Sequence, residues 1–275
     1  MSLAFLKPIQ SVLSFLTVLP AAASKGGSSS SGSGGDYYDI HYIAKNMYLF
    51  PVAGAVIGTI VGLMALGISF FLHPLLVGLL VTGSLVIMTG GNHTDALADF
   101  ADGLMAKGSK EKKRKAMLDP AVGSAGVATL VMYFVGMIIV FGTDDLSPRI
   151  KIFTSVIAAE VIAKYVMVLL AHRGLSAWVG FSSPFTAAMK DRRKIVAASG
   201  IMVAIVFFVS NYAGLAALGV SLAIAALMKY VSNKSFGGIS GDVLGASNEV
   251  TRLSSLIVLL SSSSLTSLPL VMAIR

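Results

Sequence analysis

Residues 48–72 read YLFPVAGAVIGTIVGLMALGISFFL, a stretch of 25 residues that contains no Asp, Glu, Lys or Arg. An α-helix of about 20 apolar residues is long enough to cross the hydrocarbon core of a bilayer. The other long apolar runs are residues 74–89, 122–142, 152–171, 195–210, 212–227 and 253–274. We therefore predict an all-α fold, a polytopic integral membrane protein with about seven transmembrane helices.

The composition of the whole chain supports this class. Of its 275 residues, 55% are hydrophobic and 12% are charged, whereas soluble domains carry about 25% charged residues. A membrane β-barrel would instead show short segments of alternating hydropathy. The chain has no cysteine, which excludes disulfides and thiolate metal sites, and its four scattered histidines predict no zinc site.

The polar segments between the apolar runs differ in their content of Lys and Arg. If the seven runs cross the membrane alternately, 16 of the 21 Lys and Arg residues lie on the side that holds residues 90–120. Cytoplasmic segments carry such an excess, so this side is predicted to face the cytoplasm, at the cell membrane. The net charge of +8 is therefore interpreted as a signal of topology in the lipid bilayer, and nucleic acid is not an expected partner.

We predict a single membrane-embedded domain over residues 1–275. Residues 1–20 are moderately apolar and predict an interfacial or short spanning helix, and residues 24–35, SKGGSSSSGSGG, predict a flexible loop. In the first apolar run, small residues recur every four positions, which predicts close packing against a neighbouring helix. These residues are Gly54, Gly58 and Gly62.

The segment between the second and third apolar runs is rich in acids. Residues 90–119 read GGNHTDALADFADGLMAKGSKEKKRKAMLD and contain five of the thirteen acidic residues, four of them aspartates. Asp95, Asp99 and Asp102 are spaced by four and three residues, which places them on one face of a helix. Three like charges repel each other, and a hard divalent cation such as Mg²⁺ would relieve the repulsion. A solvated acidic face is the alternative, but ionisable groups beside membrane spans are usually functional, so we favour a metal site.

A second polar segment, residues 235–252, reads SFGGISGDVLGASNEVTR. Glycines at such a position let backbone N–H groups approach an anion, although a helix-cap turn explains them equally well. Asp242 and Glu249 are seven residues apart and would share a helix face. Together with the first acidic cluster, this segment predicts a metal and phosphate site assembled from two parts of the chain.

One ion pair is predicted inside an apolar run. Glu160 and Lys164 are four residues apart, the spacing of neighbours on a helix face. The sequence leaves open whether the two side chains form an internal ion pair or contact a substrate.

Three segments resemble the cobalamin synthase family, also called adenosylcobinamide-GDP ribazoletransferases or cobalamin 5′-phosphate synthases. The segments are GGNHTDALADFADGLMA at 90–106, AMLDPAVGSAG at 116–126 and GGISGDVLGASNEV at 237–250. As a set and in this order they are specific for the family. Asn92 and Thr94 depart from the pattern, because apolar residues more usually flank the histidine between them, and Lys164 replaces an expected arginine.

The resemblance implies an integral membrane enzyme that uses Mg²⁺. It would join adenosylcobinamide-GDP to α-ribazole, or to its 5′-phosphate, and release GMP. The implied metal ligands and catalytic residues are Asp95, Asp99, Asp102 and Asp242, with His93 as a general base. His93 could equally cap the helix or orient Asp95. The implied substrate contacts are Asp119, Gly237, Gly238, Gly241, Glu249 and Lys164, with a helix N-cap as the alternative for Asp119.

Two other functions compete with this one. A CDP-alcohol phosphotransferase also presents aspartates at helical spacing to Mg²⁺, but its D-G-x-x-A-R pattern is not reproduced here. A transporter of cations or corrinoids would carry its acids within the spans rather than on one face. The sequence does not decide which lower base is used, or whether the protein is a monomer or a homo-oligomer.

Overall fold

The computed structural model describes residues 6–19, 40–142 and 149–266. Over these ranges the chain is helical and contains no β-strand, so the predicted all-α fold is confirmed. The helices are α1 (Lys7–Leu16), α2 (Ile40–Lys45), η2 (Met47–Leu49), α3 (Phe50–Ile68), α4 (Pro74–Met88), α5 (Asn92–Met105), α6 (Lys110–Met117), α7 (Ser124–Gly142), α8 (Ile150–Arg173), α9 (Ser183–Ala188), α10 (Arg192–Phe236) and α11 (Gly241–Thr266). The predicted flexible loop at residues 24–35 lies outside the described residues.

Five of the described helices are long and apolar enough to cross a membrane, which supports a multi-pass membrane protein. They are α3 together with η2, α7, α8, α10 and α11. Helices α4 and α5 reach this standard only as a pair, and a bend of 92° separates them. Because the bend turns α5 across the direction of α4, we treat α4 as a span and α5 as a helix at the membrane face.

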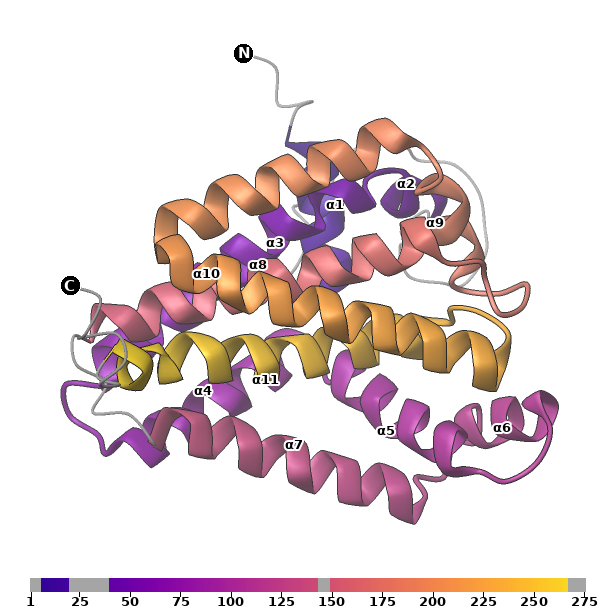
Figure 1. Cartoon of the computed structure of the whole chain (residues 1–275), viewed down its shortest axis with the longest axis horizontal. Coiled ribbons are helices and arrows are strands. Elements are labelled where there is room, and N and C mark those ends of the chain that lie inside the picture. Colours follow the sequence, from indigo (N-terminus) through magenta and orange to yellow (C-terminus); the bar gives the residue numbers. More distant parts are fainter. Residues whose placement is uncertain (1–5, 20–39, 143–148, 267–275) are drawn as a thin grey trace, which may run out of the picture.

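The two predicted runs at residues 195–210 and 212–227 lie in one element, α10, which folds back on itself. At Asn211 the backbone leaves the helical conformation, with φ 47° and ψ −132°. The two halves of α10 then run in opposite directions (Figure 1), and a Cβ on Gly214 would lie 2.5 Å from Cγ1 of Val206. The break at Asn211 falls between the two predicted runs, and α10 supplies two crossings.

Helix α8 packs closely along α3. A Cβ on Gly54 would lie 2.6 Å from the carbonyl oxygen of Glu160, and one on Gly58 would lie 2.6 Å from Cα of Ile157. Only glycine permits two backbones to approach so closely. The predicted packing stripe is therefore confirmed, with Gly62 as its third member.

The start of the last helix differs from the prediction, and the length of the first decides between two alternatives. The last predicted span begins at residue 253, but α11 begins at Gly241, so residues 241–252 of the expected polar segment belong to a spanning helix. Most polar side chains of these residues are buried inside the bundle, which is why hydropathy places the start of the helix too late. They are Ser247, Asn248, Glu249, Thr251 and Arg252. Helix α1 has ten residues, about 15 Å at 1.5 Å per residue, and is too short to span a bilayer. The interfacial alternative therefore fits it.

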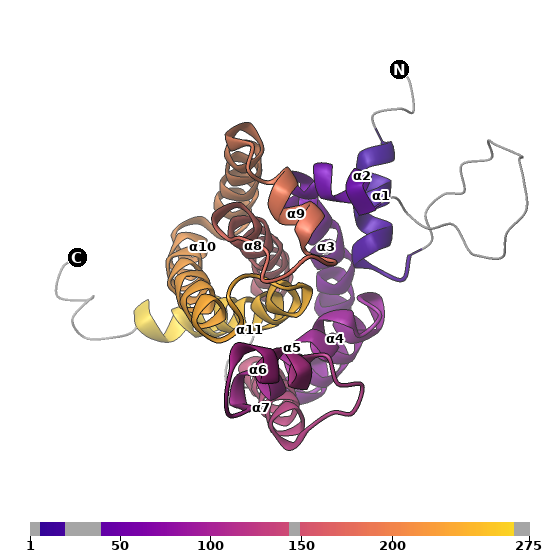
Figure 2. The same cartoon turned by 90° about the vertical axis from the view of Figure 1, so that its right-hand side faces the viewer.

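The polar connections between the spans gather at one end of the bundle, on the right in Figure 1. This end carries α5, α6, α9 and the connection from α10 to α11, whereas the turn within α10 lies at the opposite end. Figure 2 looks onto it and shows α5 beside α11 and α6 beside α5, with α9 beside α2. We call this the site end.

Candidate active site

Two glycines set the direction of α5. Gly90 and Gly91 have φ values of 64° and 72°, a left-handed conformation that glycine adopts without strain. They interrupt the chain between α4 and α5 and permit the bend of 92°. The backbone N–H of Asp95 then donates to the carbonyl oxygen of Gly91 at 2.9 Å and starts the new helix. Helix α5 therefore carries its acids across the site end.

Helix α11 brings a fourth acid to the acidic face of α5. A Cβ on Gly245 would lie 2.5 Å from Cβ of Ala96, so the first turns of the two helices are in close contact. Asp242 lies in the first turn of α11, which Ser240 caps by accepting a hydrogen bond from the N–H of Val243 at 3.2 Å. The fold therefore brings the two distant segments into contact, and the metal and phosphate site expected from them stays a prediction.

The crowding of these carboxylates shows in the pKa of Asp99. Partial burial raises this pKa from 3.8 to about 6, and the charges of Asp95, Asp242 and Asp102 add to the shift. Among the described residues, no Lys or Arg forms an ion pair with any of the four acids. The four carboxylates therefore repel each other, and no basic side chain in the described ranges compensates their charge. A bound metal cation would stabilise this face.

Asp102 also has a structural contact. Its Oδ2 accepts a hydrogen bond from the N–H of Gly123 at 2.7 Å, and its Oδ1 accepts one from Gly126 at 2.8 Å. These bonds fix the N-terminus of α7 to α5. A Cβ on Gly126 would lie 2.5 Å from Oδ2, so the contact requires glycine. A carboxylate has about four acceptor positions, so Asp102 keeps capacity for a cation but has less to spare than Asp95 or Asp99.

The donor set at this face suits Mg²⁺. Within the described ranges, no three acidic or histidine side chains are close enough to enclose a metal ion by themselves. Mg²⁺ does not need such an enclosure, because it keeps several waters and is usually bound by one or two carboxylates together with substrate phosphates. Carboxylate oxygens are also the ligands that favour Mg²⁺ over softer metals. The residues therefore fit a Mg²⁺ ion shared between protein and substrate.

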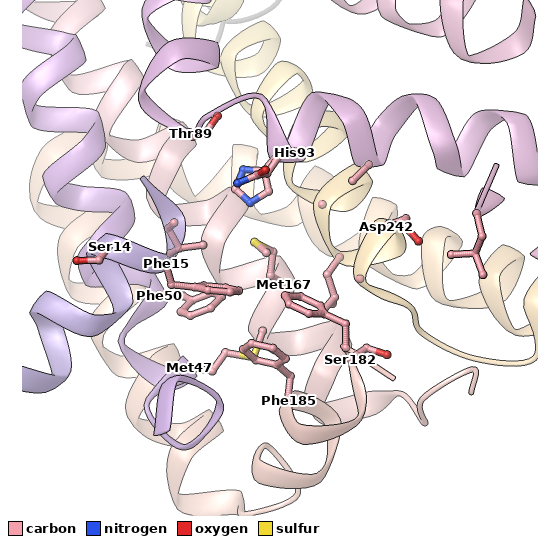
Figure 3. Close-up of a pocket in the computed structure, with 18 of the residues that line it drawn as sticks. Ser14, Phe15, Met47, Phe50, Thr89, His93, Met167, Ser182, Phe185 and Asp242 are labelled. Atoms are coloured by element: carbon pink, nitrogen blue, oxygen red, sulfur yellow. The ribbon is translucent and has the colours of Figure 1, made fainter. Parts of the chain in front are cut away.

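A cavity of about 580 Å³ opens beside the acidic face (Figure 3). His93 and Asp242 lie on its wall, together with Asn92 from the first turn of α5. Much of the remaining wall is aromatic, with ring centroids between 5.6 and 6.4 Å apart. These rings belong to Phe15, Phe50, Phe181 and Phe185. The cavity is therefore apolar over much of its surface and polar where it meets α5 and α11.

His93 connects this cavity to the interior of the bundle. Its Nδ1 lies 3.4 Å from Nδ2 of Asn248 and 3.9 Å from Oε1 of Glu249. Burial lowers the pKa of His93 well below its ordinary value, and the charges of Lys164 and Arg252 lower it further. A neutral imidazole can accept a proton, which is what the predicted general base requires. In the described part of the chain, no hydrogen bond joins His93 to an aspartate.

Behind His93 lies a buried group of charged side chains that the sequence did not predict as a unit. Arg252 of α11 donates from Nε to Glu160 of α8 and from Nη1 to Glu249, one turn earlier on α11. The same Nη1 donates to the hydroxyl of Tyr133 of α7 at 3.1 Å. The group ties three spanning helices together at the depth of His93. Its signal in the sequence was the placement of Glu249 and Arg252 three residues apart beside an apolar run.

Lys164 and Glu249, both predicted substrate contacts, belong to this buried group. The Nζ of Lys164 donates to Oδ1 of Asn248 at 2.8 Å and lies 3.4 Å from Oε2 of Glu160. The ion-pair alternative for Glu160 and Lys164 is therefore confirmed. Because Lys164 and Glu249 are both 0% exposed, they support the wall of the cavity from behind rather than line it.

The predicted glycine contacts have different surroundings. Gly237 ends α10 with φ 87°, and a Cβ on Gly238 would lie 2.5 Å from the carbonyl oxygen of Leu175. Both glycines therefore serve the turn between α10 and α11, as the helix-cap alternative supposed. Gly241 lies beside Asp242 on the wall of the large cavity, where a ligand could approach its backbone.

Asp119 lies away from the large cavity. Its Oδ1 accepts a hydrogen bond from the N–H of Ala121 at 3.0 Å, and its side chain is exposed. It lines a smaller cavity of about 330 Å³ together with Asp102 and Ser124. The acidic face of α5 therefore lies between the two cavities. Asn92, at the start of the helix, lines the large cavity, and Asp102 lines the small one.

In protein freed of divalent ions, Asp99→Asn should raise the melting temperature at pH 8. The folded state holds a proton on Asp99 up to about pH 6, whereas the carboxyl ordinarily titrates at 3.8. The contribution of this group to stability is therefore present at low pH and is lost as pH rises from about 4 to about 6. The gain from Asp99→Asn should shrink as pH falls from 8 to 4.

Thermal unfolding in EDTA across this pH range measures the effect. Glu111→Gln, which removes an exposed acid from α6 at the same end, is the control. Because the hydrogen bond with Ser109 lowers the pKa of Glu111, this acid stays ionised above pH 6, and its removal should leave the pH dependence between 6 and 8 unchanged. A destabilised Asp99→Asn protein at pH 8 would show that the four acids do not repel each other as described.

Comparisons with known proteins place the chain in a family. The family model described as Cobalamin-5-phosphate synthase matches residues 8–260. An adenosylcobinamide-GDP ribazoletransferase of Archaeoglobus fulgidus is 33% identical over 91% of this chain and 96% of its own length. The protein of the same name from Methanocella arvoryzae is 30% identical over 91% of this chain and 94% of its own length.

No solved structure matches this chain. The relatives in sequence nevertheless extend over nearly its whole length, and the family match includes α5 and the first turns of α11, where the four acids and His93 lie. The chain therefore belongs to the cobalamin-5-phosphate synthase family.

Proposed function

We propose that this chain is an adenosylcobinamide-GDP ribazoletransferase, a membrane enzyme of cobalamin biosynthesis. This is the activity named for its relatives in Archaeoglobus fulgidus and Methanocella arvoryzae. The observation that carries the proposal is the face of four carboxylates from α5 and α11, which adjoins a cavity with a neutral histidine on its wall. Transfer at phosphorus requires such groups, because catalysis depends on positioning and on neutralising phosphate charge.

The reaction is a substitution at phosphorus. A ribose hydroxyl oxygen of α-ribazole, or of its 5′-phosphate, bonds to the phosphorus that carries the cobinamide group. The bond from this phosphorus to the bridging oxygen breaks, and its electron pair leaves with GMP. The hydroxyl proton passes to His93, whose Nε2 makes no hydrogen bond to any residue in the described ranges, and then to solvent.

Mg²⁺, when bound, would neutralise charge on the diphosphate and on the departing GMP. Asp95, Asp99 and Asp242 would hold it together with the substrate phosphates, and Asp102 would add a ligand while fixing α7. For Nε2 of His93 to take this proton, the ring must carry its own proton on Nδ1, where Oε1 of Glu249 lies at 3.9 Å. In the other neutral tautomer Nδ1 accepts from Nδ2 of Asn248 at 3.4 Å, and Nε2 is protonated.

We place this site at the cytoplasmic face of the cell membrane. Helix α6 at the site end reads KEKKRKAM and adds five basic residues to the surface that surrounds the acids. An excess of Lys and Arg identifies the cytoplasmic side, and a basic surface also attracts phosphate-bearing substrates from solution.

The proposal is tested with purified protein in detergent. Adenosylcobinamide-GDP and α-ribazole phosphate are supplied with Mg²⁺ or with EDTA, and GMP is quantified by chromatography. We expect GMP only when both substrates and Mg²⁺ are present, and no product from a CDP-alcohol with an alcohol acceptor. Folded protein that releases no GMP, or that releases it equally without ribazole, would contradict the proposal.

A further inference from the structure

We propose that the 580 Å³ cavity binds α-ribazole, with the aromatic base among the phenylalanine rings and the ribose directed towards His93 and Asp242. The inference rests on the transferase function proposed above and adds which of the two substrates the cavity receives. It also makes α1, at the start of the described chain, a part of the substrate site.

The size of the cavity distinguishes the two substrates. Cavities of about 300–1,000 Å³ enclose ligands of the size of drugs, a range that includes nucleosides and nucleotides. The cavity of about 580 Å³ therefore suits α-ribazole or its phosphate. Adenosylcobinamide-GDP carries a corrin macrocycle, an adenosyl group and GDP, and it is several times larger than a nucleoside. Most of it must remain outside.

The lining agrees with an aromatic base. Figure 3 shows the rings of Phe50 and Phe185 together, with His93 and Asp242 on other sides of the cavity. The ring of Phe15 lies 6.2 Å from that of Phe50 and 5.6 Å from that of Phe185, centroid to centroid. Such a group of rings favours stacked and edge-on contacts with a flat aromatic ligand. The amide side chains of a corrin would instead lose hydrogen bonds to water against these rings.

The polar side of the cavity agrees with a ribose. Asn92, His93 and Asp242 line this part of the cavity and come from the first turns of α5 and α11. The side-chain amide of Asn92 makes no hydrogen bond to a described residue and is free to bind a hydroxyl group. A ribose placed here brings its hydroxyl to His93, while the diphosphate of the larger substrate reaches the same point along the acidic face.

Helix α1 closes the cavity on the side away from α11. Its residues Ser14, Phe15 and Leu16 all lie on the cavity wall. The N–H of Val18 donates to the carbonyl oxygen of Met88 at 2.8 Å and so fixes the end of α1 to α4. An interfacial anchor would need only an apolar face towards lipid, whereas α1 directs an aromatic side chain into the cavity.

Steady-state kinetics of Phe15→Ala tests the inference. The Michaelis constant for α-ribazole phosphate should rise about tenfold, because one of the stacking rings is lost. The constant for adenosylcobinamide-GDP and the rate with both substrates saturating should not change. Leu13→Ala is the matched control, since Leu13 lies on the same helix and packs against the core without lining the cavity. It should change neither constant.

Phe181→Ala gives a second test in case Phe15→Ala does not fold, because Phe181 lines the cavity and is 55% exposed. The same selective rise is expected. A rise confined to adenosylcobinamide-GDP, an equal rise for both substrates, or no rise in either variant would overturn the inference. Turnover of the wild-type protein tests the proposed function separately, so the two can fail independently.

Discussion

Replacing Asp99 with Asn is expected to lower the rate of GMP release by at least about a hundredfold while the protein remains folded. Asp99 lies at the centre of the acidic face, where burial and three neighbouring carboxylates raise its pKa to about 6. The negative charge of Asp99 is therefore the least stable of the four in the absence of a metal ion. A bound cation would stabilise it most. An amide of the same shape removes the charge and keeps the packing.

The rate is measured with both substrates saturating over a range of Mg²⁺ concentrations. Glu111→Gln removes an acid from the same end of the protein and is expected to turn over normally. Retention of the wild-type rate by Asp99→Asn, with the same Mg²⁺ dependence, would show that the acidic face is a solvated surface rather than the reaction centre.

Replacing Arg252 with Leu is expected to destabilise the protein by about 3–5 kcal/mol, enough to reduce the yield of folded protein severely. Arg252 pairs with Glu160 and Glu249, and all three side chains are buried within the spanning helices. Without the guanidinium, Lys164 alone would have to neutralise two carboxylates. Removal of one partner from a buried pair leaves a charge that neither water nor protein compensates.

Thermal unfolding and gel filtration in detergent measure this loss. Arg252→Lys keeps the charge but not the two-sided contact of the guanidinium, so it should be intermediate. Arg193→Leu removes an exposed arginine from the start of α10 and should change the stability by no more than about 0.5 kcal/mol. An Arg252→Leu protein as stable as this control would mean that the buried group does not hold α7, α8 and α11 together.

Much of the fold could be predicted because its main determinants are local. Apolar runs indicate where the spans lie, and a repeat of glycines indicates a close helix contact that the structure confirms for Gly54 and Gly58. The acidic face of α5 could be predicted for the same reason, since spacings of four and three residues place side chains on one face of any helix.

The features that could not be predicted depend on tertiary contacts. The start of α11 was placed too late because Asn248, Glu249 and Arg252 resemble a polar loop until their partners on α7 and α8 are known. The aromatic cavity was missed because Phe15 and Phe185 are far apart in the chain and meet only when α1 and α9 pack together. Similarly, only the packing shows that Gly238 is required by the backbone of Leu175.

We propose that carboxylates of α5 and α11 form one divalent-cation site for the transferase reaction. Mn²⁺ binding, followed by electron paramagnetic resonance with adenosylcobinamide-GDP present and α-ribazole absent, tests this claim most directly. Substrate without protein gives the baseline, and Asp242→Asn removes only the acid contributed by α11. We predict that wild-type protein binds Mn²⁺ above the baseline, that Mg²⁺ displaces it, and that Asp242→Asn weakens the binding about tenfold or more. Equal binding by the wild type and the variant would contradict the claim.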